Sequence, residues 1–254
     1  MTTIVLVMVL SPLQLPATAT GLFRHLAEAR LEDLLNEWEK ATENIRAAHY
    51  VIDWTHEGRV LKDKEIFQIE GFIGRSNLAR IDFKDENGKP TQIFLLVNGR
   101  ILETYNFARQ DKTLWEIPVG FPEKYLDGCW WEVFLAGIFQ NARELFCFEF
   151  AVADIQQQFD TRLIREDKYW AYIHLTPKTK QRQSILRNME VVLDQKTHLV
   201  RQYRVIDVNG NRDIYDFQKL EVNPTPPITL ESISKDLPKS FKELQMNKEL
   251  QINP

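Results

Sequence analysis

Cysteine, long apolar runs and an excess of charge of one sign are all scarce in this chain of 254 residues. Its two cysteines, Cys129 and Cys147, fall in a stretch with helical spacing of apolar residues. In a continuous helix their separation corresponds to roughly 27 Å, far beyond the Cα distance that a disulfide tolerates. We therefore expect two free thiols, and without histidine partners at ligand spacing they predict no metal site.

The balance of charge and the short apolar runs exclude two classes of protein. Lys and Arg number 32 against 36 Asp and Glu, so the chain lacks the clustered basic excess of a nucleic-acid-binding protein. No apolar run reaches the roughly 18 residues of a membrane-spanning helix. The histidines form no H-E-x-x-H pattern, and no serine lies in G-x-S-x-G. The sequence thus predicts no nucleic-acid partner, no cofactor and no catalytic residues.

The first twenty residues differ from the rest of the chain. Residues 4–10 form an apolar core, prolines follow it, and Ala17-Thr18-Ala19 has the small-x-small form of a signal-peptidase site. We expect residues 1–19 to be a signal peptide and the exported chain to begin near Thr20. No Lys or Arg precedes Arg24, so the basic region of a signal peptide is missing. The alternative is an apolar segment that stays on the protein.

Strand patterns and tight turns fill most of the remaining chain. Asn87-Gly88, Asn98-Gly99 and Asn209-Gly210 stand between apolar-rich runs, and Asn-Gly is the preferred pair where a hairpin needs φ > 0 at both central residues. Within the runs, apolar and polar residues alternate with the period of two that a strand requires. We expect about eleven strands, near residues 46–57, 65–75, 78–86, 91–97, 100–107, 112–118, 160–166, 169–176, 184–193, 198–208 and 212–222.

Two segments follow helical spacing instead. Residues 27–45 predict an amphipathic helix, and Glu123–Phe148 predicts one that is apolar on more than half its circumference, as a helix over a cavity would be. The proline-rich tail is expected to form an extended arm with a short helix near 238–246. The predicted fold class is mainly β with helices (α+β), in one domain. Its core is a half-open curled antiparallel β-sheet, or half-barrel, with helices covering an apolar concave face.

Large apolar side chains gather on one side of these elements. Tyr50, Ile52 and Trp54 share one face of their strand because successive side chains alternate. Such residues either fill an ordinary core or line a cavity for an apolar ligand, and the sequence leaves both open. Arg80 is expected to face solvent. The residues predicted to line a ligand cavity are Tyr50, Ile52, Trp54, Phe67, Ile69, Trp115, Trp131, Phe134 and Ile138.

Five short motifs follow one another along residues 30–228. They are the helix and strand of Leu34–Thr55, the segment Glu70–Arg80, the hairpin Leu96–Asn106, the strand end Tyr172–Lys178 and the closing hairpin pair Met189–Val222. In this order they resemble the periplasmic outer-membrane lipoprotein carriers, called LolA-like. In the second motif, Arg75-Ser76-Asn77-Leu78 stands where the family has Arg-Pro-Asn-Leu.

The resemblance implies a half-open β-barrel with a helical lid over an apolar cavity, which takes up acyl chains of lipoproteins without chemistry. It places Arg75 on the family's lid-contacting arginine. The implied layout is a signal peptide in 1–19, a LolA-like half-barrel domain in 20–228 and a C-terminal arm in 229–254. The implied protein is a periplasmic, monomeric, non-catalytic carrier, whose partners are acyl chains of lipids or lipoproteins and membrane-bound donor or acceptor proteins. The same fold serves modules that sense lipids or lipoproteins, so a sensor is the alternative.

Overall fold

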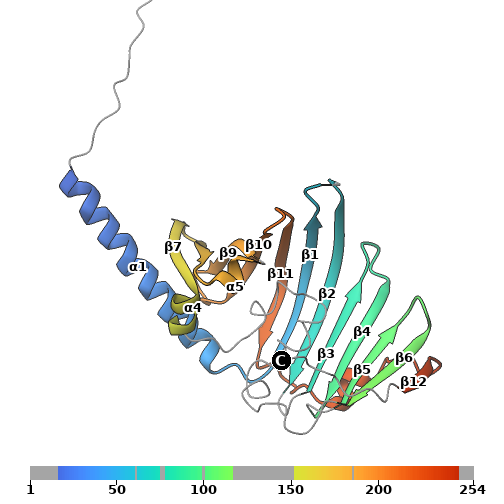
Figure 1. The fold of residues 1–254 in the computed structure, drawn as a ribbon. Helices are drawn as coiled ribbons and strands as arrows, with labels where there is room; N and C mark the ends of the chain where they lie inside the picture. Colours follow the sequence, from blue (N-terminus) through green and yellow to red (C-terminus); the bar gives the residue numbers. More distant parts are fainter. Residues whose placement is uncertain are drawn as a thin grey trace, which may run out of the picture.

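The computed structural model describes residues 17–60, 62–74, 78–98, 101–116, 152–184 and 186–245. These residues form one twelve-stranded sheet, curled and not closed, with helices beside it (Figure 1). The predicted fold class, mainly β with a half-open curled sheet, is confirmed. Outside the described residues lie the predicted helix Glu123–Phe148 with Cys129 and Cys147, and the predicted site residues Arg75, Trp131, Phe134 and Ile138.

Six consecutive strands form one half of the sheet as an antiparallel meander, and each strand end lies within two residues of its expected position. The Asn-Gly turn between the third and fourth strands is tight, because the Gly88 N–H donates to Asp85 O at 2.9 Å. Gly88 has a φ of +74°, which glycine adopts without steric cost. The strands are β1 (Ala48–Glu57), β2 (Lys64–Gly74), β3 (Leu78–Lys84), β4 (Pro90–Val97), β5 (Ile101–Asn106) and β6 (Asp111–Glu116).

Five further strands form the other half of the sheet, again close to their expected spans. They are β7 (Phe159–Glu166), β8 (Trp170–Pro177), β9 (Leu186–Asp194), β10 (Val200–Asp207) and β11 (Arg212–Val222). Two short helices, α4 (Val152–Gln158) and α5 (Lys180–Gln183), precede β7 and β9. The halves join where β11 pairs antiparallel with the whole of β1. The order along the sheet is therefore β6-β5-β4-β3-β2-β1-β11-β10-β9-β8-β7, with β12 (Lys242–Gln245) beside β6.

The long helix α1 (Ala17–Glu43) lies against β7 and α4 at one end of the sheet (Figure 1). It begins ten residues before the expected start at residue 27. Leu34, Leu35 and Trp38 are buried in the same cluster as the sheet residues, so one face of α1 packs on the sheet. Within the described part of the chain, no helix combines the length and the hydropathy that crossing a membrane requires.

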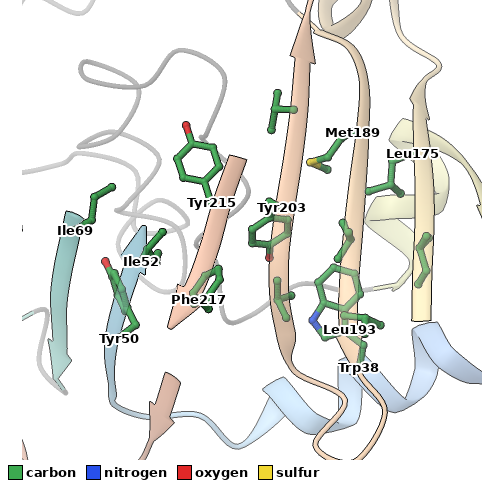
Figure 2. Packing of buried hydrophobic residues seen from close by; sticks show 14 of the residues in the cluster. Trp38, Tyr50, Ile52, Ile69, Leu175, Met189, Leu193, Tyr203, Tyr215 and Phe217 are labelled. Carbon is green, nitrogen blue, oxygen red and sulfur yellow. The ribbon is translucent and has the colours of Figure 1, made fainter. Parts of the chain in front are cut away.

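The face of the sheet that packs against α1, called the inner face below, is apolar across both halves. Strand alternation places Tyr50, Ile52 and Ile69 on this face, and all three are buried. Figure 2 shows them in one layer with side chains from β8 to β11 and with Trp38 of α1. One continuous cluster therefore runs over the inner face from β4 to β7.

The tail returns across the opposite face, called the outer face. It forms α6 (Leu230–Ser234) and then β12, which pairs parallel with β6. The predicted helix near 238–246 is wrong at residues 242–245, because these residues form a strand that pairs with β6. The Lys242 N–H, for example, donates to Gln110 O at 3.1 Å.

Arg80 also differs from its prediction. Alternation along β3 does place it on the outer face, but only 4% of the residue is exposed. The tail explains the burial, because Ile233 O accepts a hydrogen bond from Arg80 Nη1 at 2.7 Å. The expectation that Arg80 faces solvent is therefore wrong.

Candidate functional site

Three aromatic rings from adjacent strands stack on the inner face. The Trp54 ring lies 5.0 Å from the Phe67 ring and 6.0 Å from the Tyr215 ring, centroid to centroid, with interplanar angles of 27° and 5°. Trp54 and Phe67 are half-buried, whereas Tyr215 is buried. The stack, called the aromatic stack below, is therefore a partly exposed part of the apolar inner face.

A single carboxylate fixes the polar edge of the aromatic stack. Asp213 Oδ1 accepts a hydrogen bond from Trp54 Nε1 at 3.0 Å and lies 2.8 Å from His56 Nδ1. Burial of the imidazole opposes its protonation, but the bond to Asp213 and the charges of Asp213, Glu65 and Asp63 together raise the pKa of His56. The indole and the imidazole are thus tied to one strand, β11, across the pairing with β1.

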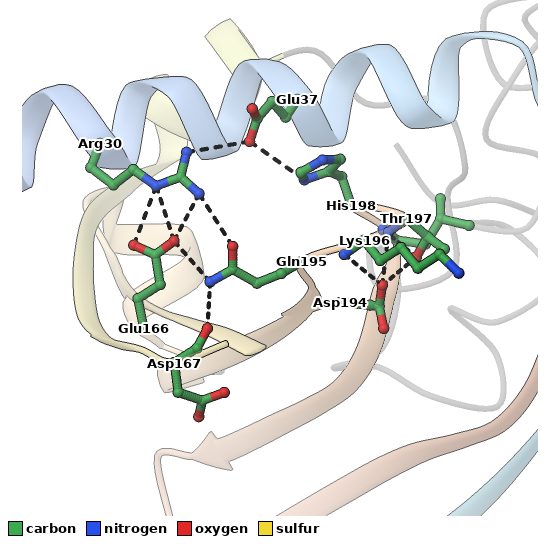
Figure 3. Close-up of polar contacts among 10 residues, drawn as sticks. Arg30, Glu37, Glu166, Asp167, Asp194, Gln195, Lys196, Thr197 and His198 are labelled. Carbon is green, nitrogen blue, oxygen red and sulfur yellow. Dashed lines mark hydrogen bonds and ion pairs between the residues drawn. The ribbon is translucent and has the colours of Figure 1, made fainter. Parts of the chain in front are cut away.

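At the β7 end of the sheet, polar contacts join α1 to two hairpin turns (Figure 3). Arg30 Nε and Nη2 donate to Glu166 Oε1 at 3.0 and 2.7 Å, and Nη2 also donates to Gln195 Oε1 at 3.3 Å. The hydrogen bond from Arg30 lowers the pKa of Glu166 in spite of partial burial. Farther along the helix, Glu37 Oε2 lies 3.4 Å from His198 Nδ1. We call these contacts the α1 latch, since they hold the helix to the turns β7–β8 and β9–β10.

The inner face offers apolar surface rather than reactive groups. Burial raises the pKa of Tyr50 and of Tyr215, so both hydroxyls stay neutral. Among the described residues, no three His, Cys, Asp or Glu side chains gather as metal ligands would. The described part of the inner face is therefore suited to burying apolar groups.

The predicted cavity residues fall into four groups. Tyr50, Ile52 and Ile69 lie in the buried inner-face cluster, and Trp54 and Phe67 belong to the aromatic stack. Trp115 lies on β6, where its Cα partner is Leu102. Trp131, Phe134 and Ile138, like the predicted lid contact Arg75, lie outside the described residues. Cavity lining by these residues stays a prediction.

Several polar residues of the site were missed by the sequence analysis. Asp213 lies 157 positions from His56, and Glu166 lies 136 positions from Arg30. Such pairs have no local signature, because they depend on which distant elements meet. The pairing of β1 with β11 would have shown the first contact, since it makes His56 and Asp213 Cα partners.

An open, curled antiparallel sheet with a helix on its apolar inner face is a β half-barrel. The family model for the outer membrane lipoprotein carrier protein LolA matches residues 145–230, which contain α4 and the strands β7 to β11. The resemblance to LolA-like carriers is therefore confirmed, and families of this type are generally non-catalytic carriers. No curated protein matches the chain.

Solved structures with a similar arrangement have low sequence identity. An uncharacterized conserved protein from Thermus thermophilus is 11% identical at a TM-score of 0.48, over 85% of this chain and 99% of its own. Lipoprotein LppX from Mycobacterium tuberculosis is 12% identical at 0.41, over 78% and 99%. The Pseudomonas aeruginosa MucA/MucB complex contains a chain 14% identical at 0.40, over 79% of this chain and 59% of that one.

Proposed function

We propose that the protein is a non-catalytic carrier that shields the acyl chains of lipids or lipoproteins on the apolar inner face of its half-barrel. The observation that carries this proposal is the continuous apolar cluster on an open sheet, with the half-buried aromatic stack as part of its surface. The LolA match over the second half of the sheet supports the class of cargo. No catalysis, metal or cofactor enters the proposal.

The proposal includes the layout and location of the protein. Residues 1–19 are a signal peptide, residues 20–228 are the half-barrel domain, and residues 229–254 are the C-terminal arm. The mature protein is a monomer in the periplasm, where it receives its cargo from one membrane-bound protein and delivers it to another. Support for export comes from the small-x-small motif at Ala17-Thr18-Ala19 and from the resemblance to periplasmic carriers.

The physical basis of binding is removal of hydrocarbon from water. Burying one methylene group contributes about 0.8 kcal/mol, so about ten methylenes supply ~8 kcal/mol, which corresponds to a Kd of about 1 µM. Few polar contacts are needed. A single acyl chain therefore has enough apolar surface for specific, reversible binding.

Two features of the described residues support a carrier that keeps its shape. Asp213 holds the Trp54 indole by a hydrogen bond, so the aromatic stack is a rigid platform and loses little side-chain entropy on binding. The α1 latch fixes the helix against β7, which limits how far that end of the sheet can open. Release of cargo then requires competition by an acceptor.

The second candidate is a module that senses lipids or lipoproteins and passes the signal to a protein. It requires a protein-binding surface in addition to the inner face. The observation that favours this candidate is the apolar area on the outer face, which is described in the next subsection.

Native mass spectrometry of protein purified from periplasmic extract tests the proposal. We expect adducts with the mass of acylated lipids or lipopeptides, which disappear after organic extraction and reappear when the lipid is added back. A protein that is free of lipid in every preparation, and takes up none when lipid is supplied, contradicts the carrier.

A further inference from the structure

A second apolar surface lies on the outer face, apart from the cluster that carries the proposed function. Leu78, Ile93 and Leu95 are buried there, with Phe72 and Tyr105 on the flanking strands. We call this area, with Arg80 at its centre, the outer-face surface. The solvent-facing side of an antiparallel sheet is normally polar. Apolar side chains on this face therefore need another part of the chain to shield them from water.

The cover is the chain's own arm, residues 229–245. Ile233 of α6 is 3% exposed in this cluster. The Phe241 ring packs at 5.2 Å from the Phe107 ring and 6.4 Å from the Tyr105 ring, centroid to centroid. At the end of the arm, β12 pairs with β6, and Lys112 Nζ lies 3.3 Å from a Glu243 carboxylate oxygen.

Arg80 is oriented by a residue of its own strand as well as by the arm. Its Nε and Nη2 donate to the two carboxylate oxygens of Asp82 at 2.6 and 2.7 Å, which is the bidentate geometry that fixes a guanidinium plane. The remaining nitrogen, Nη1, donates to Ile233 O and to the Asp236 carboxylate. Arg80 therefore presents a pre-oriented donor edge, the Nη1 side of its guanidinium, which donates hydrogen bonds to one backbone carbonyl and to one acidic side chain.

The two sides of the contact are unequal. The Arg80 side chain is 5% exposed against 72% for Asp236, and Lys112 is 22% exposed against 46% for Glu243. The regular structure of the arm consists of a helix of five residues and a strand of four residues. The outer-face surface is thus built into the sheet, whereas the arm is a short segment laid upon it.

We propose that the outer-face surface is a peptide-docking site, which the arm fills within the chain and which a partner polypeptide of the same chemistry fills in exchange. The arm defines the pattern: an aliphatic side chain, an acid three residues later, an aromatic side chain five residues after that, and a short strand (Ile233, Asp236, Phe241 and β12). Charge complementarity favours such a partner, because Arg80 and Lys112 face acids of the arm.

The arm is also separate from the proposed carrier function. The LolA match ends at residue 230, the first residue of α6, so all of the arm after its first two residues lies beyond the match. Peptide docking on the outer face does not depend on acyl-chain binding on the inner face. The two proposals are therefore tested by separate experiments.

The test uses the full-length chain and a fluorescein-labelled synthetic peptide of residues 229–245, with binding followed by fluorescence anisotropy. The variant Ile233→Ser/Asp236→Asn weakens the arm's two anchors and leaves the surface intact. We expect this variant to bind the peptide about tenfold more tightly than the wild-type chain does. This factor corresponds to a wild-type arm that leaves the site free in about one molecule in ten, because occupation by the arm reduces the apparent affinity by the free fraction. The matched control is Lys239→Gln, an exposed residue of the arm, which should behave as wild type.

Two further comparisons show whether Arg80 reads the peptide. A peptide carrying Asp236→Asn should bind at least about tenfold more weakly to the anchor variant. Adding Arg80→Met with Asp82→Leu removes the donor edge without leaving a buried charge, and should abolish binding while circular dichroism shows a folded chain. If the double anchor variant fails to fold, the single Asp236→Asn chain, which keeps Ile233, takes its place.

Binding that is equal in all chains, or unaffected by the charge at Asp236, overturns the docking site. Sedimentation of the wild-type chain adds one more outcome. A dimer that the peptide dissociates would assign the surface to a second copy of this chain and overturn the separate partner.

Discussion

The phenol ring of Tyr50 lies over Gly71, its Cα partner on the neighbouring strand. A Cβ at residue 71 would stand 2.0 Å from Tyr50 Cζ, a distance that no real side chain adopts. Tyr50 is 1% exposed, so the ring cannot move aside without repacking the core. We expect Gly71→Ala to lower the free energy of unfolding by about 1–3 kcal/mol, the usual cost of overpacking. Urea denaturation measures this cost.

The matched background for that prediction is Tyr50→Leu, which removes the ring that the new methyl group meets. In this background Gly71→Ala should cost less, with a coupling energy of about 1 kcal/mol or more in the double-mutant cycle. Additive costs would show that the contact between ring and glycine is not the cause.

Arg30→Met should loosen α1 at the latch. Arg30 and Glu166 are both partly exposed, and solvent screening limits such a pair to about 1 kcal/mol. The pKa of Glu166 is lowered in the folded state. The stabilisation of the fold by ionised Glu166 is therefore fully present above the unfolded pKa of about 4.3. It is lost as the pH falls through the lower pKa of the folded state.

Thermal denaturation of wild type and Arg30→Met at pH 7 and at pH 3 measures this effect. The two melting temperatures should differ at pH 7 and converge at pH 3. Arg162→Met on β7 is the control, since Arg162 is exposed and lies outside the latch. A loss of equal size for Arg162→Met would contradict a specific role of the latch.

His56→Gln tests the polar edge of the aromatic stack. The pKa of His56 is raised in the folded state. Its stabilising effect is therefore complete below the unfolded pKa of about 6.5 and is lost as the pH rises through the higher folded value. The stability difference between wild type and His56→Gln should be larger at pH 5.5 than at pH 8.5, by urea denaturation. A constant difference, or the same trend for His174→Gln three strands from β11, would count against the pair with Asp213.

Most of the sheet was predictable from sequence because its signals are local. Alternation and Asn-Gly turns set strand ends such as those of β4, expected at 91–97 and found at Pro90–Val97. Arg80 and β12 could not be predicted in the same way. Alternation correctly placed Arg80 on the outer face, but its burial depends on Ile233, 153 positions away. In the candidate site, the apolar residues followed from periodicity, whereas Asp213 depends on a long-range strand pairing.

Removing Arg80 alone should cost more than removing it together with its partner. Arg80→Met leaves the Asp82 carboxylate buried without its cation, and such losses cost about 3–5 kcal/mol. Arg80→Met/Asp82→Leu removes both charges and should recover most of that stability. Urea denaturation of the two variants gives the comparison. A double variant as unstable as the single one would mean that the arm contacts, and not the unpaired carboxylate, dominate.

Two adjacent residues of β2 allow a test of acyl-chain binding on the inner face. Phe67 lies on the inner face in the aromatic stack, whereas Ile66 is exposed on the other side of the strand. The measurement is titration with a fluorescent fatty-acyl probe. We predict saturable binding with a Kd of about 1 µM or tighter, equivalent to ~8 kcal/mol. Phe67→Asp should weaken it at least about tenfold and Ile66→Asp should leave it unchanged. No saturable binding by the wild-type protein, or equal losses in the two variants, would contradict the carrier.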